Sequence, residues 1–178
     1  GRVTFPKIEQ GGVDVLLSTA YVLEQGWIED MSLVRKLFWL FPKVKKLIVD
    51  PTYFDSTIAM LENMEEQIVS YNKVREEGTR KVVLAANSRD IKLAIQNGDM
   101  CVVHSVEGGH SLNGKAAGKL YSEENAIEPN EIRNEVLDNL QTLYDKGVAY
   151  LGLAHFYPNR CVFPVFPYPE YGASHLDW

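Results

Sequence analysis

The hydrophobic residues of this chain follow two patterns, short continuous runs and repeats every three or four positions. Short runs rich in Val, Leu and Ile, bounded by glycine or polar residues, are typical of buried strands. They occur at Gly12–Val22, Lys81–Ala85, Met100–Val106 and Val148–Leu153. The last residues of the third run lead directly into Glu107, so this pattern predicts a strand that ends at a carboxylate.

Other stretches repeat apolar residues every three or four positions, which is typical of amphipathic helices. The helices we expect cover Asp30–Leu40, Thr52–Glu77, Arg89–Asn97 and Asn130–Lys146. Ser88 is the expected N-cap of the third, and Gly78 the expected end of the second. Phe5–Gln10 suits a short helical turn, whereas Val44–Val49 fits a helix or a short extended piece.

Strands that alternate with helices predict parallel βαβ units and an α/β fold. A (β/α)8 TIM barrel usually needs about 250 residues, so the four strands expected here make an incomplete barrel. An open doubly wound sheet is the alternative, but no phosphate-binding glycine-rich turn follows the first strand. We expect a single domain over residues 1–178, in which the proline- and aromatic-rich stretch 156–178 forms a loop.

Composition and charge argue against a nucleic-acid-binding protein, a membrane-spanning protein and a disulfide-rich scaffold. The chain has 178 residues, 46% hydrophobic and 24% charged, with a net charge of −6, so it has no large basic field to attract nucleic acid. No apolar run reaches the ~18 residues that span a bilayer, and no signal peptide is evident. Cys101 and Cys161 form neither a metal-ligand pattern nor a disulfide framework, so the compartment stays undecided.

Candidate chemistry gathers at the predicted strand ends. Glu107 and His155 each follow a strand, and in a barrel such ends share one face. A carboxylate can hold a divalent metal, and an imidazole can ligate a metal or donate to an oxyanion. His110 either orients Glu107 or simply lies in the loop, and Tyr21 either lines the same pocket or packs at its rim. Alternation puts His104 on the opposite face, as a buried histidine with a hydrogen-bond partner.

One motif resembles a known family. The run Ser105-Val-Glu-Gly-Gly-His-Ser-Leu112, the preceding Ala94–Asp99, the stretch Gly147–His155 and the stretch Gly11–Tyr21 are similar, in the same order, to the membrane (renal) dipeptidase family of the amidohydrolase superfamily. The resemblance implies a TIM barrel with two divalent metals, usually zinc, and hydrolysis of dipeptides or similar small peptide-like substrates. It implies that Glu107 bridges the metals, that His155 contacts the substrate carbonyl, and that a metal-bridged hydroxide attacks.

The chain also departs from that family. The family's His-x-Asp would precede Gly1, and its later metal-binding histidines, substrate arginine and aspartate would follow Trp178. Ala154 stands where the family has Thr. Three interpretations remain: part of a metal-dependent hydrolase, a catalytically inactive fragment or degenerate relative that binds a ligand or serves a structural role, and an unrelated α/β hydrolase or sugar-binding barrel. A partial barrel would expose sheet edges, which argues either for a truncated chain or for a homo-oligomer in which another copy pairs with those edges.

Overall fold

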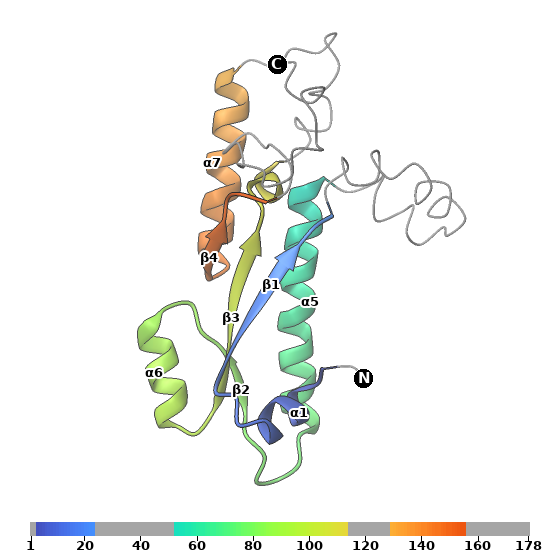
Figure 1. The fold of residues 1–178 in the computed structure, drawn as a ribbon, viewed down its shortest axis with the longest axis vertical. Coiled ribbons are helices and arrows are strands. Elements are labelled where there is room, and N and C mark those ends of the chain that lie inside the picture. Colours follow the sequence, from blue (N-terminus) through green and yellow to red (C-terminus); the bar gives the residue numbers. More distant parts are fainter. Residues whose placement is uncertain (1–2, 24–51, 114–128, 156–178) are drawn as a thin grey trace, which may run out of the picture.

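A computed structural model describes residues 3–23, 52–113 and 129–155 of the chain. Strands and helices alternate along these residues, as the periodicity predicts for an α/β protein (Figure 1). The elements, numbered as in Figure 1, are α1 (Phe5–Gln10), β1 (Val15–Tyr21), α5 (Tyr53–Val74), β2 (Val82–Leu84), α6 (Ser88–Gln96), β3 (Met100–Glu107), the 3-10 helix η1 (Gly109–Leu112), α7 (Pro129–Asp145) and β4 (Val148–Gly152).

Among the described residues, β1, β2 and β4 each pair with β3, and all three pairings are parallel. On one side of β3, β1 runs in unbroken register from Val15 opposite Cys101 to Tyr21 opposite Glu107. On the other side, β2 pairs with the first residues of β3 and β4 with its last residues. The expected parallel architecture is confirmed. A closed barrel is not seen, because the described strands form one four-stranded sheet with β3 at its centre.

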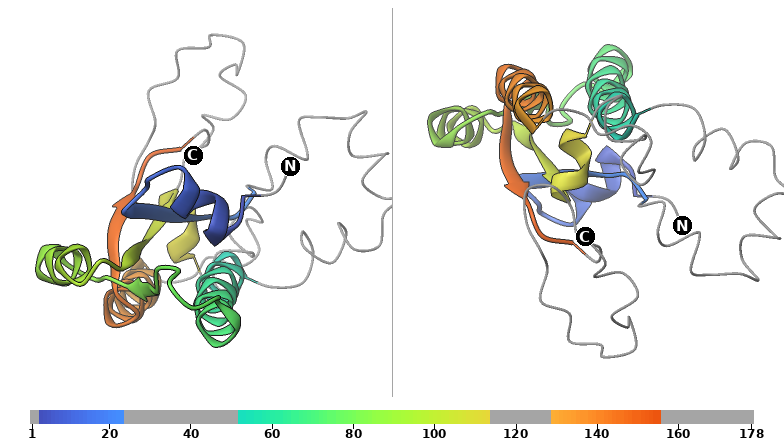
Figure 2. Two further views of the ribbon diagram at one scale, coloured as in Figure 1. Left: turned by 90° about the horizontal axis from the view of Figure 1, so that it is seen from below. Right: turned by 90° about the horizontal axis from the view of Figure 1, so that it is seen from above.

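Side-chain alternation along β3 separates the core into two parts. Val102 and Val106 lie on the face covered by α5 and α7, where Val106 packs with Leu61 and Leu143. Figure 2 shows these two helices on the same side of the sheet. Cys101 on the opposite face of β3 belongs to a separate cluster with Ala94 of α6. The buried strand β3 therefore contributes residues to all three hydrophobic clusters, two on the α5 face and one on the opposite face, which holds its carboxyl end in a defined place.

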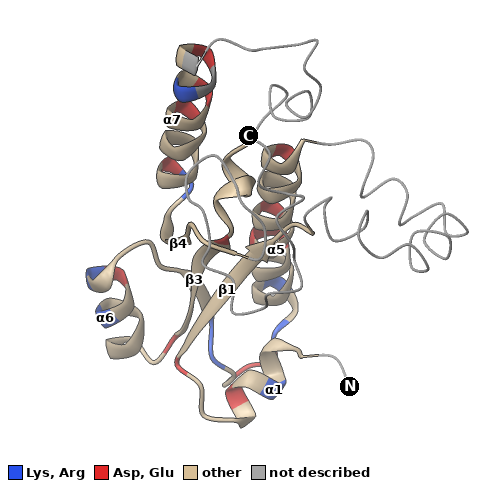
Figure 3. Cartoon of the chain, turned by 45° about the horizontal axis from the view of Figure 1, so that its top comes forward, with Lys and Arg blue, Asp and Glu red and all other residues tan. Residues whose placement is uncertain are grey.

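Helix α5 begins where the sequence predicts and ends earlier. The Thr52 hydroxyl accepts a hydrogen bond from the N–H of Asp55 at 3.0 Å and so caps the first turn. The helix ends at Val74 instead of continuing to Gly78, because Arg75 adopts extended backbone angles of φ −60° and ψ 144°. Acidic residues lie along α5 and α7 in Figure 3, as on the polar faces of amphipathic helices.

The predicted cap of α6 was wrong by one residue. Asn87 is the N-cap, and its side-chain oxygen accepts hydrogen bonds from the N–H groups of Arg89 and Asp90 at 2.9 and 3.0 Å. Ser88 is instead the first helical residue. Both residue types favour the N-cap position, so the backbone conformation decides between them.

Some expectations fall outside the described residues. They concern the helix over Asp30–Leu40, the segment Val44–Val49 and the loop over 156–178. Within the ranges that the structure does describe, no helix is both long and apolar enough to cross a bilayer.

Candidate functional site at the carboxyl ends of the strands

The parallel register brings three strand ends to one edge of the sheet. Glu107 is the last residue of β3, and it lies opposite Tyr21 on one side and Gly152 on the other. His155 follows three residues after the end of β4. The chain therefore delivers Tyr21, Glu107 and His155 to neighbouring positions, as expected for the carboxyl ends of parallel strands.

Glu107 and His155 form the polar centre of this site. The Nε2 atom of His155 lies 3.8 Å from Oε1 of Glu107, within ion-pair range and beyond hydrogen-bond length. The histidine side chain is 11% exposed, whereas the carboxylate is 51% exposed. The sequence-predicted pair thus comes together, with the acid facing solvent and the imidazole mostly enclosed.

The turn after β3 is held against the end of β4. Gly108 has φ +94°, a conformation that strongly favours glycine. Its N–H donates to the carbonyl oxygen of Gly152 at 2.7 Å, and the N–H of Gly109 donates to that of Leu153 at 2.8 Å. These two bonds extend the ladder beyond the strand and fix where the 3-10 turn η1 begins.

His110 lies in that turn, almost fully buried. Its Nε2 atom is 2.8 Å from the carbonyl oxygen of Val22, just past β1. Because a carbonyl only accepts, Nε2 carries the proton in this contact. His110 thus lies in the turn, which is one of the two placements expected for it, and its bond to Val22 ties η1 to the end of β1.

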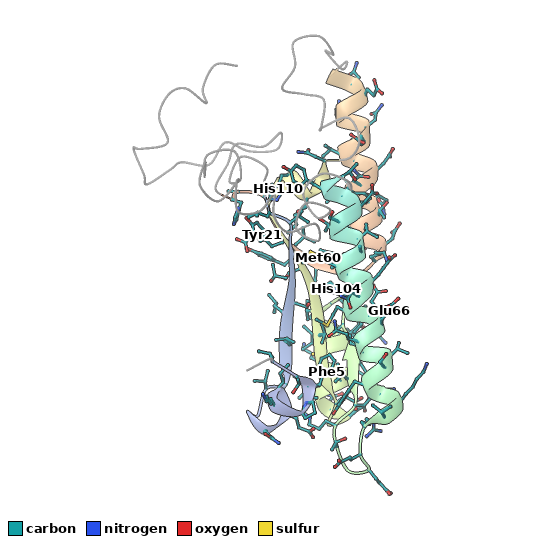
Figure 4. The ribbon with its side chains drawn as sticks, turned by 90° about the vertical axis from the view of Figure 1, so that its right-hand side faces the viewer. Phe5, Tyr21, Met60, Glu66, His104 and His110 are labelled. Atoms are coloured by element: carbon teal, nitrogen blue, oxygen red, sulfur yellow. The ribbon has the colours of Figure 1, made fainter. Side chains whose placement is uncertain are left out.

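Aromatic rings surround the two histidines. The ring of Tyr21 lies 4.5 Å from that of His155 and meets the His110 ring edge-on at 6.1 Å. The two imidazoles are 6.2 Å apart. Figure 4 shows Tyr21 and His110 near the same end of the molecule. Tyr21 therefore packs directly against the ring of His155.

Tyr53 is a member of the site that sequence patterns did not reveal. It is the first residue of α5, and its ring meets His110 edge-on at 5.2 Å. The next residue, Phe54, donates its N–H to the carbonyl oxygen of Asn113 at 3.1 Å. The helical spacing of apolar residues does not distinguish Tyr53 from its neighbours. The one available signal is that Tyr53 directly follows Thr52, the N-cap of α5, and so lies at the start of the helix.

His104 lies away from this site, as alternation predicts. It is fully buried on the α5 face, and its Nε2 atom is 3.4 Å from Oε1 of Glu65. The ammonium of Lys146 lies 3.8 Å from the same oxygen and 3.3 Å from Oε1 of Glu62. Burial lowers the pKa of His104, and the Glu65 carboxylate opposes that shift only in part. This histidine therefore links the sheet to α5 as a neutral group.

The described residues do not complete a metal centre. Among them, no group of three His, Cys, Asp or Glu side chains is placed to hold a metal ion. Glu107 and His155 offer one carboxylate and one imidazole, whereas catalytic zinc sites use three protein ligands. The zinc centre that the dipeptidase resemblance implies would need further ligands.

A scan against protein-family models and a search of curated proteins both found no match to this chain. The resemblance to the membrane dipeptidases therefore remains an interpretation of the motifs around Glu107 and His155.

Proposed function

We propose that this chain carries part of the active site of a hydrolase that cleaves small peptide-like amides, as in metal-dependent dipeptidases. The observation that carries the proposal is the 3.8 Å approach of Glu107 and His155 at the carboxyl ends of adjacent parallel strands. In α/β enzymes, catalytic groups concentrate at this edge of the sheet.

The two side chains have complementary chemistry. His155 is largely enclosed, so a hydrogen bond from its ring to a developing oxyanion would be little weakened by water. Glu107 is open to solvent on one side, where a substrate or a divalent ion such as Zn²⁺ can approach. Because the described ligands are too few for a metal site, we assign no step of the reaction to the metal.

The test uses a panel of dipeptides, with and without added Zn²⁺, and a protein in which this chain is joined to the ligands that complete the site. We expect hydrolysis by the unaltered protein, and a fall of about 10²-fold or more in kcat/KM for Glu107→Gln and for His155→Asn. Glu66→Gln is the matched control, since Glu66 is an exposed carboxylate on α5 and should leave the rate unchanged. Full activity of Glu107→Gln would show that this carboxylate has no part in the reaction.

A second candidate is a binding protein that uses the side chains at the strand ends to hold a ligand without catalysis. The shortage of metal ligands among the described residues favours it. In that case the chain binds dipeptides saturably without cleaving them, and Tyr21→Ala weakens binding because the Tyr21 ring packs on His155. Tyr144→Ala, which removes an exposed ring on α7, is the control. Isothermal titration beside a chromatographic assay for cleavage separates the two candidates.

A further inference from the structure

His155 lies on irregular backbone, unlike the carboxylate that it faces. Glu107 is the last residue of β3, whereas His155 comes three residues after the end of β4, where the backbone is neither strand nor helix. A side chain on such backbone is placed less precisely than one on a strand. The 3.8 Å separation of His155 from Glu107 is longer than a hydrogen bond, so this contact alone does not fix the imidazole ring. Packing against other side chains must contribute to its position.

The ring of Tyr21 supplies part of that packing. It lies 4.5 Å from the ring of His155, with the two planes inclined at 46°. The backbone of Tyr21 is held in the sheet, because this last residue of β1 lies in register with Glu107. Its side chain can still turn about two bonds. Whatever holds the Tyr21 ring therefore also affects where His155 lies.

The ring of His110 meets that of Tyr21 edge-on, with the centroids 6.1 Å apart and the planes at 89° (Figure 4). This imidazole has little freedom, since it is 4% exposed and its Nε2 donates to the carbonyl oxygen of Val22 at 2.8 Å. Its Cε1 and Nδ1 lie so close to Gly108 that a Cβ added there would overlap them. The ring of Tyr53 packs against it at 5.2 Å. His110 is therefore a fixed surface for the Tyr21 ring.

We propose that His110 is a positioning residue of this site, and that it acts on His155 through the ring of Tyr21. The same imidazole packs on Gly108, the residue that directly follows Glu107. One side chain thus contacts both the ring that packs on His155 and the backbone that carries Glu107. The role of His110 in catalysis rests on the proposed function, whereas the geometry can be measured without any reaction.

Nuclear magnetic resonance of the full chain, labelled with ¹³C in histidine and tyrosine, tests the ring contacts. We expect a nuclear Overhauser effect between the rings of Tyr21 and His155 in the unaltered chain, and its loss in His110→Gln. Glutamine keeps an N–H that can reach Val22 but removes the ring that meets Tyr21. His104→Gln is the matched control, because it removes another buried imidazole, on the α5 face of β3, and should leave the effect intact. In His155→Asn the resonances of the His155 ring disappear, which assigns them.

A second variant, Tyr53→Leu, removes one support of the His110 ring and should weaken the same effect. Circular dichroism confirms that each variant is folded. Positioning by His110 is wrong if the unaltered chain shows no effect between Tyr21 and His155. It is also wrong if the effect persists unchanged in His110→Gln and Tyr53→Leu, or if His104→Gln abolishes it as well.

Kinetics test the consequence for the reaction, in the protein in which this chain is joined to the ligands that complete the site. His110→Gln should lower kcat about 10-fold or more and leave KM within about twofold, because a misplaced imidazole is felt mainly in the transition state. His104→Gln should leave both constants unchanged. A failure of the unaltered protein to hydrolyse dipeptides would refute the proposed function, and the ring contacts would still decide whether His110 positions His155.

Discussion

Replacing Gly108 by alanine should destabilise the fold through the ring of His110. Gly108 has φ +94° and ψ 122°, a region that L residues rarely adopt, so the methyl group costs about 1–3 kcal/mol in backbone strain alone. An added Cβ would also overlap Cε1 and Nδ1 of His110. That ring cannot move outward freely, because it is buried and bonded to the carbonyl oxygen of Val22.

The displaced ring adds to the strain. Loss of the bond to Val22 costs about 0.5–1.5 kcal/mol, and disturbed contacts with Tyr21 and Tyr53 cost a similar amount. We therefore expect Gly108→Ala to lower the free energy of unfolding by roughly 3–5 kcal/mol. Urea unfolding at a fixed protein concentration measures this change from the midpoint and slope.

The chain offers a matched control in Gly78. It also has a positive φ, of +87°, but nothing lies within 4 Å of the Cβ that alanine would add there. Gly78→Ala should therefore cost only the strain, roughly 1–2 kcal/mol. In a His110→Ala background the cost of Gly108→Ala should fall to the same level. Equal costs for Gly78→Ala and Gly108→Ala in the unaltered chain would refute the proposed clash with His110.

Two further predictions concern the packing of α5 on the sheet. Burial lowers the pKa of His104 in the folded chain from its ordinary 6.5, so the unfolded chain binds more protons. The stability that His104 contributes is therefore fully present above pH 6.5. It is lost as the pH falls through the lower pKa of the folded chain. His104→Asn should flatten the fall of the urea midpoint between about pH 7 and pH 5, and an unchanged slope would mean that other groups cause it. Asn72 of α5 accepts from the N–H of Val82 at 3.0 Å and donates to its carbonyl oxygen at 2.7 Å, so Asn72→Ala should cost about 1–3 kcal/mol of unfolding free energy. Gln67→Ala, which removes only an exposed bond to Asn63, should cost under about 0.5 kcal/mol, and a similar loss in both variants would contradict this reasoning.

The sequence predicted most elements because periodicity reports directly on burial. The run Met100–Val106 and the three-to-four spacing after Thr52 both correspond to observed elements, β3 and α5. Helix ends were less predictable, since Arg75 leaves the helix through its backbone angles and no glycine or proline marks that position. Hydrophobic patterns say which residues are buried, and they say little about where a helix stops.

Strand order was harder to predict than strand identity. The pattern does not show that β2 and β4 share one side of β3, because register depends on side-chain packing between strands. The meeting of Glu107 and His155 was predictable, since parallel strand ends share an edge. The contact of Tyr53 with His110 was not, because it joins a helix start to a distant turn and leaves no periodic signal.

The pairing of β1 with β3 also determines how early this part of the sheet can form during synthesis. Thr19 and Ser105, whose hydroxyls are 2.7 Å apart across these strands, are separated by 86 positions in the chain. At a translation rate of roughly 5–20 residues per second, β1 waits on the order of ten seconds before its partner strand has been made. Throughout that interval β1, which has no charged residue, lacks the pairing with β3 that it has in the folded chain. A chaperone that binds nascent chains should therefore contact Val15–Tyr21 before the other strands that the structure describes, and release it once β3 emerges.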